Sequence, residues 1–266
     1  MTTPRPFRFG VVAGRPSSGA DWLATARSVE ALGYDTLLLP DTAYTPSPFP
    51  ALAAAAAATS TLRVGPWVLA APFRTPAAVV RETAALQLLS GGRFELGIGT
   101  GRPDAAREAQ MLGQEWGSVG DRIARLVDTV TAVRAQVSPV PRVAVAAVGR
   151  RMLAAGHHAD TIALALPPDA WVEPVEQVAD LDRAGGDESE LTLQISGVAG
   201  RLVSYLARQG FGPDGLRGAA GVLEGDPDAM AEALLELRRR TGVSYVCVAA
   251  EHAELFAPVR QALAST

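Results

Sequence analysis

The chain has 266 residues, which fits one large domain or two small ones, and its 48% hydrophobic and 20% charged residues lie near the averages for globular proteins. Its 24 basic and 28 acidic residues give a net charge of −4 without a cationic cluster, so we expect neither nucleic acid nor an anionic membrane surface as a partner. All 24 basic residues are arginine, which excludes a Schiff-base or P-loop lysine mechanism.

Cysteine content and apolar patterning bear on the compartment. The single cysteine, Cys247, cannot form an internal disulfide. No run of about 18 apolar residues predicts a membrane span, and residues 1–8 lack the apolar segment of a secretion signal. We therefore expect a cytoplasmic protein.

Short apolar or β-branched runs alternate with longer segments of helical periodicity along the whole chain. This alternation predicts repeated βα units around a parallel sheet. The candidate strands are Phe9–Ala13, Thr36–Pro40, Arg63–Leu69, Phe94–Ile98, Val143–Ala147, Thr161–Leu166, Leu191–Ile195 and Val243–Ala249. Eight units of about 33 residues predict an α/β protein with one (β/α)8 TIM barrel over residues 1–266, in preference to an open doubly wound sheet.

Several helices can be placed from their periodicity and end signals. Trp22, Ala26 and Val29 form one apolar stripe of a helix that Ser18 or Asp21 could cap. The alanine-rich stretch 52–60 predicts a closely packed helix.

The end of the chain carries clearer signals. Asp226 followed by Pro227 predicts a helix start, and Gly242 predicts its end directly before the last strand. The glycine-rich stretch 197–221 is the least regular part of the chain, and we interpret it as a mobile flap at the end of the seventh strand.

Barrel enzymes place their sites at the carboxyl ends of the strands, so the loops after the strands are the candidate site. Asp41 follows the second strand and could contact a ligand or cap the next turn. The fourth strand runs into Gly97, Gly99 and Gly101, followed by Arg102. Such a glycine-rich end can let backbone N–H groups approach an anion, or can form a tight turn without a ligand.

The fifth strand offers a similar end, with small residues at 146–149 and then Arg150 and Arg151. Small residues make room for a ligand, and guanidinium groups bind oxyanions through two hydrogen bonds. These two neighbouring loops together predict an anion-binding edge.

Other chemistries have little support. The chain has neither a Gly-x-Ser-x-Gly elbow nor a His-Glu-x-x-His motif. His157 and His158 are adjacent and His252 is distant in sequence, so no metal site is expected, and Cys247 fits a small buried residue better than a nucleophile. Aromatic residues that could line a pocket or pack in the core are Trp67, Trp116, Trp171, Tyr44 and Phe73.

The stretch 88–101, LLSGGRFELGIGTG, resembles the signature of the bacterial-luciferase-like superfamily of flavin- and coenzyme F420-dependent oxidoreductases. Further similarity lies in FGV at 9–11, LGYD at 32–35, FRTP at 73–76, RETAAL at 81–86 and GVSYV at 242–246. The chain looks most like the F420-dependent subgroup, although the FMN-using branch shares most of these motifs. The family fold is the same barrel.

This resemblance implies a flavin-type ring across the barrel mouth. The positions that would touch the cofactor are Asp41, Ala70, Ala71, Thr100, Gly101, Arg102, Ala146, Ala147, Gly149 and Arg150. It also implies a cis peptide beneath the ring, which the alignment of motifs places at Ala70–Ala71. The cofactor would be F420, slightly preferred, or FMN, the substrate a small organic molecule, and the assembly a homodimer.

Two departures from the family pattern keep an alternative open. Thr42 stands where the family commonly has histidine, and Arg102 stands where the sugar dehydrogenases of the family carry glutamate. The first expectation is an F420- or FMN-dependent oxidoreductase or monooxygenase. The alternative is a catalytically inactive barrel that serves as a binding or partner subunit.

Overall fold

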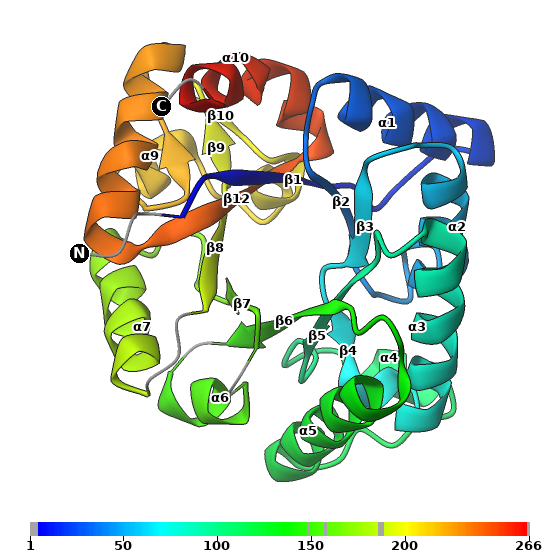
Figure 1. Ribbon diagram of the computed structural model, residues 1–266. Coiled ribbons are helices and arrows are strands. Elements are labelled where there is room, and N and C mark those ends of the chain that lie inside the picture. The colour runs from blue at the N-terminus through cyan, green and yellow to red at the C-terminus, as the bar shows by residue number, and fades with distance from the viewer. Residues whose placement is uncertain (1–4, 148, 157–158, 186–188, 265–266) are drawn as a thin grey trace.

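Parallel strands form the wall of a barrel, and helices lie around it (Figure 1). The computed structural model describes residues 5–147, 149–156, 159–185 and 189–264. The wall strands follow the order β3-β2-β1-β12-β8-β7-β6-β5-β4. Their bounds are β1 Arg8–Val12, β2 Thr36–Leu39, β3 Arg63–Pro66, β4 Leu69–Ala70, β5 Glu95–Gly99, β6 Arg142–Ala147, β7 Thr161–Leu164, β8 Glu190–Gln194 and β12 Val243–Ala249. The predicted (β/α)8 barrel is therefore confirmed.

The third wall position is split, which the sequence did not indicate. β3 pairs with β2, and after a break at residues 67–68 the chain continues as β4, which pairs with β5. A parallel bridge from Val64 to Phe94 closes the wall between β3 and β5. The cis peptide lies at Trp67–Val68, so its expected position at Ala70–Ala71 is wrong. Ala70 is instead the last residue of β4, and Ala71 is the first residue of a 3₁₀ turn. The cis peptide lies earlier because the chain leaves β2 and joins β5 already at residues 67–68.

The helices pack outside the wall. They are α1 Gly19–Ala31, α2 Pro48–Ala57, α3 Pro76–Ser90, α4 Ala106–Met111, α5 Val119–Gln136, α6 Arg150–Ala155, α7 Val172–Ala184, α8 Ser204–Arg208, α9 Pro227–Thr241 and α10 Ala253–Ala264. The predicted α1 stripe of Trp22, Ala26 and Val29 is buried, and the Ser18 side chain accepts the Asp21 N–H as its cap. Helix α2 starts four residues before the predicted alanine stretch, because Pro48 suits a first helical turn.

The end signals of α9 are also confirmed. The Asp226 side chain accepts a hydrogen bond from the N–H of Ala229 at 2.9 Å. Gly242 closes the helix with φ of 80°, a left-handed conformation that glycine adopts without a steric penalty. The last wall strand, β12, starts at the next residue.

The stretch 197–221 has more regular structure than its composition suggests. β9 Gly197–Val198, β10 Arg201–Leu202 and β11 Val222–Leu223 form a small separate sheet, and α8 lies between β10 and β11. The backbone hydrogen bonds of this sheet hold both ends of the stretch at the end of β8. Mobility of this segment stays a prediction.

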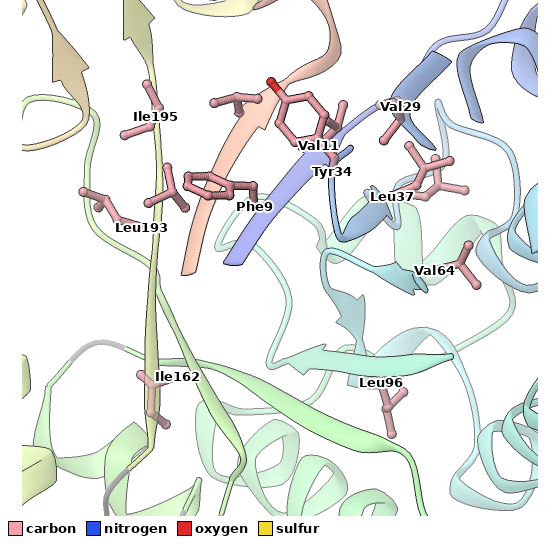
Figure 2. Close-up of a cluster of buried hydrophobic side chains, with 14 of the residues drawn as sticks. Phe9, Val11, Val29, Tyr34, Leu37, Val64, Leu96, Ile162, Leu193 and Ile195 are labelled. Carbon is pink, nitrogen blue, oxygen red and sulfur yellow. The ribbon is translucent and has the colours of Figure 1, made fainter. Parts of the chain in front are cut away.

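The hydrophobic core lies between the wall and the helices. Figure 2 shows wall residues such as Phe9, Val11 and Leu37 beside Val29 of α1. Inside the barrel, Tyr245, Leu38 and Cys247 form a second buried cluster. Buried side chains thus pack both between the wall and the helices and inside the barrel.

An ion-pair network fills the amino end of the barrel. Arg8 contacts Glu95 and Glu190 at 2.7 Å each, Arg63 joins Glu95, and Arg142 joins Glu190 at 3.1 Å. Each of these five residues is the first of its strand. The Arg8 guanidinium also lies 4.5 Å from the centre of the Tyr245 ring, which separates the network from the opposite end. These contacts fill the amino end of the barrel interior.

Among the described residues, no helix combines the length and apolarity needed to cross a bilayer.

Candidate active site

A cavity of about 510 Å³ opens at the carboxyl ends of the wall strands. A volume of this size is in the usual range for small-molecule and cofactor sites. Its lining residues come from the ends of β2, β4, β5, β6, β7 and β8, from the break at 67–68 and from the 197–221 stretch. The cavity therefore lies where barrel enzymes carry their sites.

Six of the ten sequence-predicted positions line this cavity. They are Asp41, Ala70, Thr100, Gly101, Arg102 and Ala146. The other four positions do not. Ala71 and Ala147 are buried in the hydrophobic core instead, Gly149 precedes α6, and Arg150 is exposed at its first turn. Val148, between these positions, lies outside the described residues.

Asp41 is held by an ion pair. The Arg74 guanidinium donates two hydrogen bonds to it, at 2.6 and 3.2 Å, and the Ala70 N–H donates a third at 3.1 Å. The alternative that Asp41 caps the following turn is wrong, because Thr42 and Thr45 close that turn. Arg74 belongs to the FRTP motif, but no role for it was predicted.

The glycines at the end of β5 have a packing role. A Cβ at Gly97 would lie 2.2 Å from the Pro66 carbonyl oxygen, and a Cβ at Gly99 would lie 2.9 Å from the Val68 side chain. These two glycines therefore make room for the 66–68 crossing. Gly101 has φ of 82° and packs against Trp116. Contacts within the protein therefore explain all three glycines without a ligand.

Arg102 is paired with two carboxylates. It contacts Glu108 and Asp104, the latter at 3.3 Å. Glu108 is buried, and its other carboxylate oxygen accepts the Ala43 N–H at 2.7 Å. This cluster ties the loop after β2 to the loop after β5, a link between two segments that are distant in sequence.

Neutral polar groups line the side of the cavity nearest β8: Trp67, which the sequence offered as a pocket residue, and Gln194, Ser196 and Tyr205, which sequence reasoning missed. The Trp67 indole N–H donates to the Gln194 side chain at 3.3 Å. Tyr205 on α8 lies within hydrogen-bonding reach of the Ser196 side chain, and burial raises the pKa of the Tyr205 phenol, which stays protonated at neutral pH. Gln194 and Ser196 could have been found as polar residues at a strand end, whereas the position of Tyr205 depends on the fold of the 197–221 stretch.

Other reactive groups do not form a site. Burial raises the pKa of the Cys247 thiol to about 12, so this residue stays protonated, as expected for a small buried side chain. Among the described residues no group of three or more His, Cys, Asp or Glu side chains could hold a metal ion. His157 and His158 lie outside the described residues.

The cavity fits a planar ring cofactor. Its lining includes the small apolar side chains of Val68, Ala70 and Ala146, together with Thr100 and Gly101 at the end of β5. Cofactor sites are mostly apolar, with a few polar groups that fix the orientation of the ligand. The donor set is therefore compatible with a flavin-type ring.

Residues 5–199 match the protein family described as Luciferase-like monooxygenase. Two curated relatives are named F420-dependent glucose-6-phosphate dehydrogenase. The one from Amycolatopsis mediterranei is 37% identical over 82 residues, 30% of this chain and 24% of the relative. The one from Kribbella flavida is 31% identical over 137 residues, 48% of this chain and 40% of the relative. The matches thus span less than half of either relative.

Solved structures share the whole fold. The coenzyme F420 dependent tetrahydromethanopterin reductase from Methanopyrus kandleri superposes with a TM-score of 0.71 at 16% identity, over 97% of this chain and 98% of the other. The oxygenating constituent of 3,6-diketocamphane monooxygenase from Pseudomonas putida, in complex with FMN, gives the same TM-score and identity over 97% and 95%. At this identity the likeness concerns the fold.

Proposed function

Because the chain belongs to the luciferase-like monooxygenase family, we propose that it is an oxidoreductase that uses a flavin-type cofactor, coenzyme F420 or FMN, on a small organic substrate. The observation that carries the proposal is the cavity at the carboxyl ends of the strands, where six positions inferred from the family resemblance meet.

The cofactor preference is F420. The two relatives named as F420-dependent enzymes support it, whereas the similarity to an FMN complex supports the second choice. When bound, such a cofactor supplies hydride transfer or, in the case of reduced FMN, activation of oxygen. The residues of the chain would hold the ring against Val68 and Ala146 and exclude water with the aromatic side chains of Trp67 and Phe73.

The anionic tail of the cofactor would lie between the loops after β5 and β6. Thr100, Gly101 and Gly149 would donate backbone hydrogen bonds, and Arg150 would pair with the anion. Arg150 supports this proposal because its side chain has no ion pair with any other described residue. Arg102 is less suitable because Glu108 and Asp104 already neutralise it.

Titration of the purified chain with oxidised F420 and with FMN tests the proposal. Saturable binding of one of them in the micromolar range, followed by substrate-dependent oxidation of the reduced form, is expected. Absence of binding of both below high micromolar concentrations would refute the enzyme and favour the binding or partner subunit, the alternative that Thr42 motivates.

We also propose a homodimer in the cytoplasm. The support is the family resemblance for the dimer and the single unpaired Cys247 for a reducing compartment. Light scattering at tens of micromolar tests the assembly, and a monomeric mass would overturn it. Fractionation of the source cells tests the compartment.

A further inference from the structure

The charges around the cavity decide which substrates it can hold. Of the described lining residues, Asp41 and Arg102 carry charge, and both are paired. Arg74 pairs with Asp41 at 2.6 Å and lies 3.9 Å from the Glu82 carboxylate, so its charge is neutralised. Arg102 faces two carboxylates, Asp104 and Glu108, so this cluster has a net charge of −1. A substrate anion near either cluster would find no free cation and would be repelled by the second one.

The remaining surface of the cavity is mostly apolar. Small or aliphatic side chains form the wall between β6 and β8, among them Met152, Ala163, Leu166, Pro167 and Leu193. Transfer of an anion from water to such a surface is unfavourable, whereas an alkyl group gains about 25 cal/mol for each Å² buried. An uncharged apolar molecule therefore suits this wall.

A pair of hydroxyl groups interrupts the apolar surface on one side. Ser196 follows β8, Tyr205 lies on α8, and both side chains line the cavity. The Tyr205 phenol, which is 41% exposed, is protonated at neutral pH, because its usual pKa of 10 is already well above 7 and partial burial raises it further, so it can donate a hydrogen bond. A hydrogen-bond donor in an apolar cavity favours a ligand with one acceptor oxygen, because that oxygen satisfies the donor.

We propose that the substrate is an uncharged, largely apolar molecule with a carbonyl or hydroxyl oxygen, and that Tyr205 holds this oxygen. The proposal rests on the proposed function and narrows it. It separates this chain from the relatives named for glucose 6-phosphate, whose substrate carries a phosphate group.

Two probes of equal chain length, one neutral and one anionic, together with a sugar phosphate test the charge selectivity. The full chain, with and without saturating cofactor, is titrated with 2-octanone, with octanoate and with glucose 6-phosphate, and binding is followed through calorimetry. We expect 2-octanone to bind at least about tenfold more tightly than either anion, the loss that an unpaired anion suffers beside buried carboxylates. Equal or tighter binding of octanoate or glucose 6-phosphate overturns the proposal, and so does the absence of 2-octanone binding.

Variants separate the two parts of the proposal. Tyr205→Phe removes only the hydroxyl and should weaken 2-octanone binding about three- to tenfold, while Tyr44→Phe, the same change at an exposed tyrosine outside the cavity lining, should leave it unchanged. Asp104→Asn removes an exposed carboxylate from the Arg102 cluster and should strengthen octanoate binding selectively. No effect of Tyr205→Phe refutes the oxygen contact, and no effect of Asp104→Asn refutes the role of the cluster.

The two levels of the proposal fail differently. If neither F420 nor FMN binds, the proposed function fails, and the titration of the cofactor-free chain still decides the class of ligand. If a cofactor binds but octanoate or glucose 6-phosphate binds more tightly than 2-octanone, the proposed function is retained and the proposed substrate class is wrong.

Discussion

Arg74 and Asp41 form a two-pronged ion pair at the cavity, with N–O distances of 2.6 and 3.2 Å. The two residues lie 33 positions apart, Asp41 after β2 and Arg74 after the 3₁₀ turn that follows β4. Their side chains are 5% and 16% exposed, so solvent screens the pair little. The Asp41 carboxylate therefore links the loop after β2 to the loop after β4.

Arg74→Ala should lower the free energy of unfolding by about 3 kcal/mol, because it leaves the Asp41 carboxylate buried without its cation. Urea denaturation at neutral pH measures the change. Arg217→Ala is the matched control, since Arg217 and Asp214 are 69% and 97% exposed, and a change under about 1 kcal/mol is expected there. Equal effects of the two substitutions would contradict a buried tie.

Arg102→Ala and Arg150→Ala should differ in kind. Arg102→Ala deprives the buried Glu108 of its cation and should lower the free energy of unfolding by about 1–2 kcal/mol. Arg150→Ala should leave unfolding unchanged and weaken cofactor binding roughly ten- to a hundredfold, the loss of a charge-assisted hydrogen bond to phosphate. Urea denaturation of both variants measures the change in stability, and cofactor titration of both measures the change in affinity.

Unchanged cofactor affinity in Arg150→Ala would place the anionic tail elsewhere. Gly149→Val is a weaker test than this substitution. Gly149 has φ of 75°, so valine would strain the backbone there whether or not a ligand approaches.

Gly97→Ala should be strongly destabilising, by at least about 2 kcal/mol, because the new Cβ would lie 2.2 Å from the Pro66 carbonyl oxygen. Thermal unfolding measures the loss. Gly19→Ala is the control in α1, where no atom lies within 4 Å of the new Cβ and alanine favours the helix. A Gly97→Ala variant as stable as the Gly19→Ala variant would show that the 66–68 crossing can shift.

Glu30 should make the stability depend on acidic pH. Hydrogen bonds from the backbone of Thr61, Leu62 and Ser60 and from the Thr61 hydroxyl outweigh the effect of burial and lower the pKa of Glu30 from its usual 4.5 to about 2. A lowered folded-state pKa adds stability above the unfolded-state value, and this stability disappears as the pH falls from about 4.5 to about 2.

The contribution of Glu30 should be about 1 kcal/mol at neutral pH, since the carboxylate is solvent-screened. The difference in unfolding free energy between the wild type and Glu30→Gln should therefore be largest at pH 7 and shrink near pH 2. A difference independent of pH would show that the charge of Glu30 has no part in holding the 60–62 loop.

The sequence by itself determined the barrel and many of its element ends. Alternating strand and helix patterns depend on local side-chain periodicity, and caps such as Ser18, Asp226 and Gly242 act on neighbouring backbone groups, so both can be read along the chain. The loops at the carboxyl ends of the strands followed from the barrel, which is why Asp41, Thr100 and Ala146 were placed at the cavity.

Only the tertiary structure decided what these residues do. The partner of Asp41, Arg74, lies 33 residues away after β4, and Glu108, which pairs with Arg102, also accepts the Ala43 N–H from the loop after β2, so nothing in the local sequence specifies these contacts. Gly97 belongs to a glycine-rich strand end for which the sequence predicted an approach to an anion or a tight turn, yet its lack of a side chain makes room for Pro66 on the neighbouring strand. Tyr205 lines the cavity because the pairing of β9 with β11 brings the two ends of the stretch that carries α8 together just after β8. These features depend on distances between segments far apart in the chain, which periodicity and spacing do not contain.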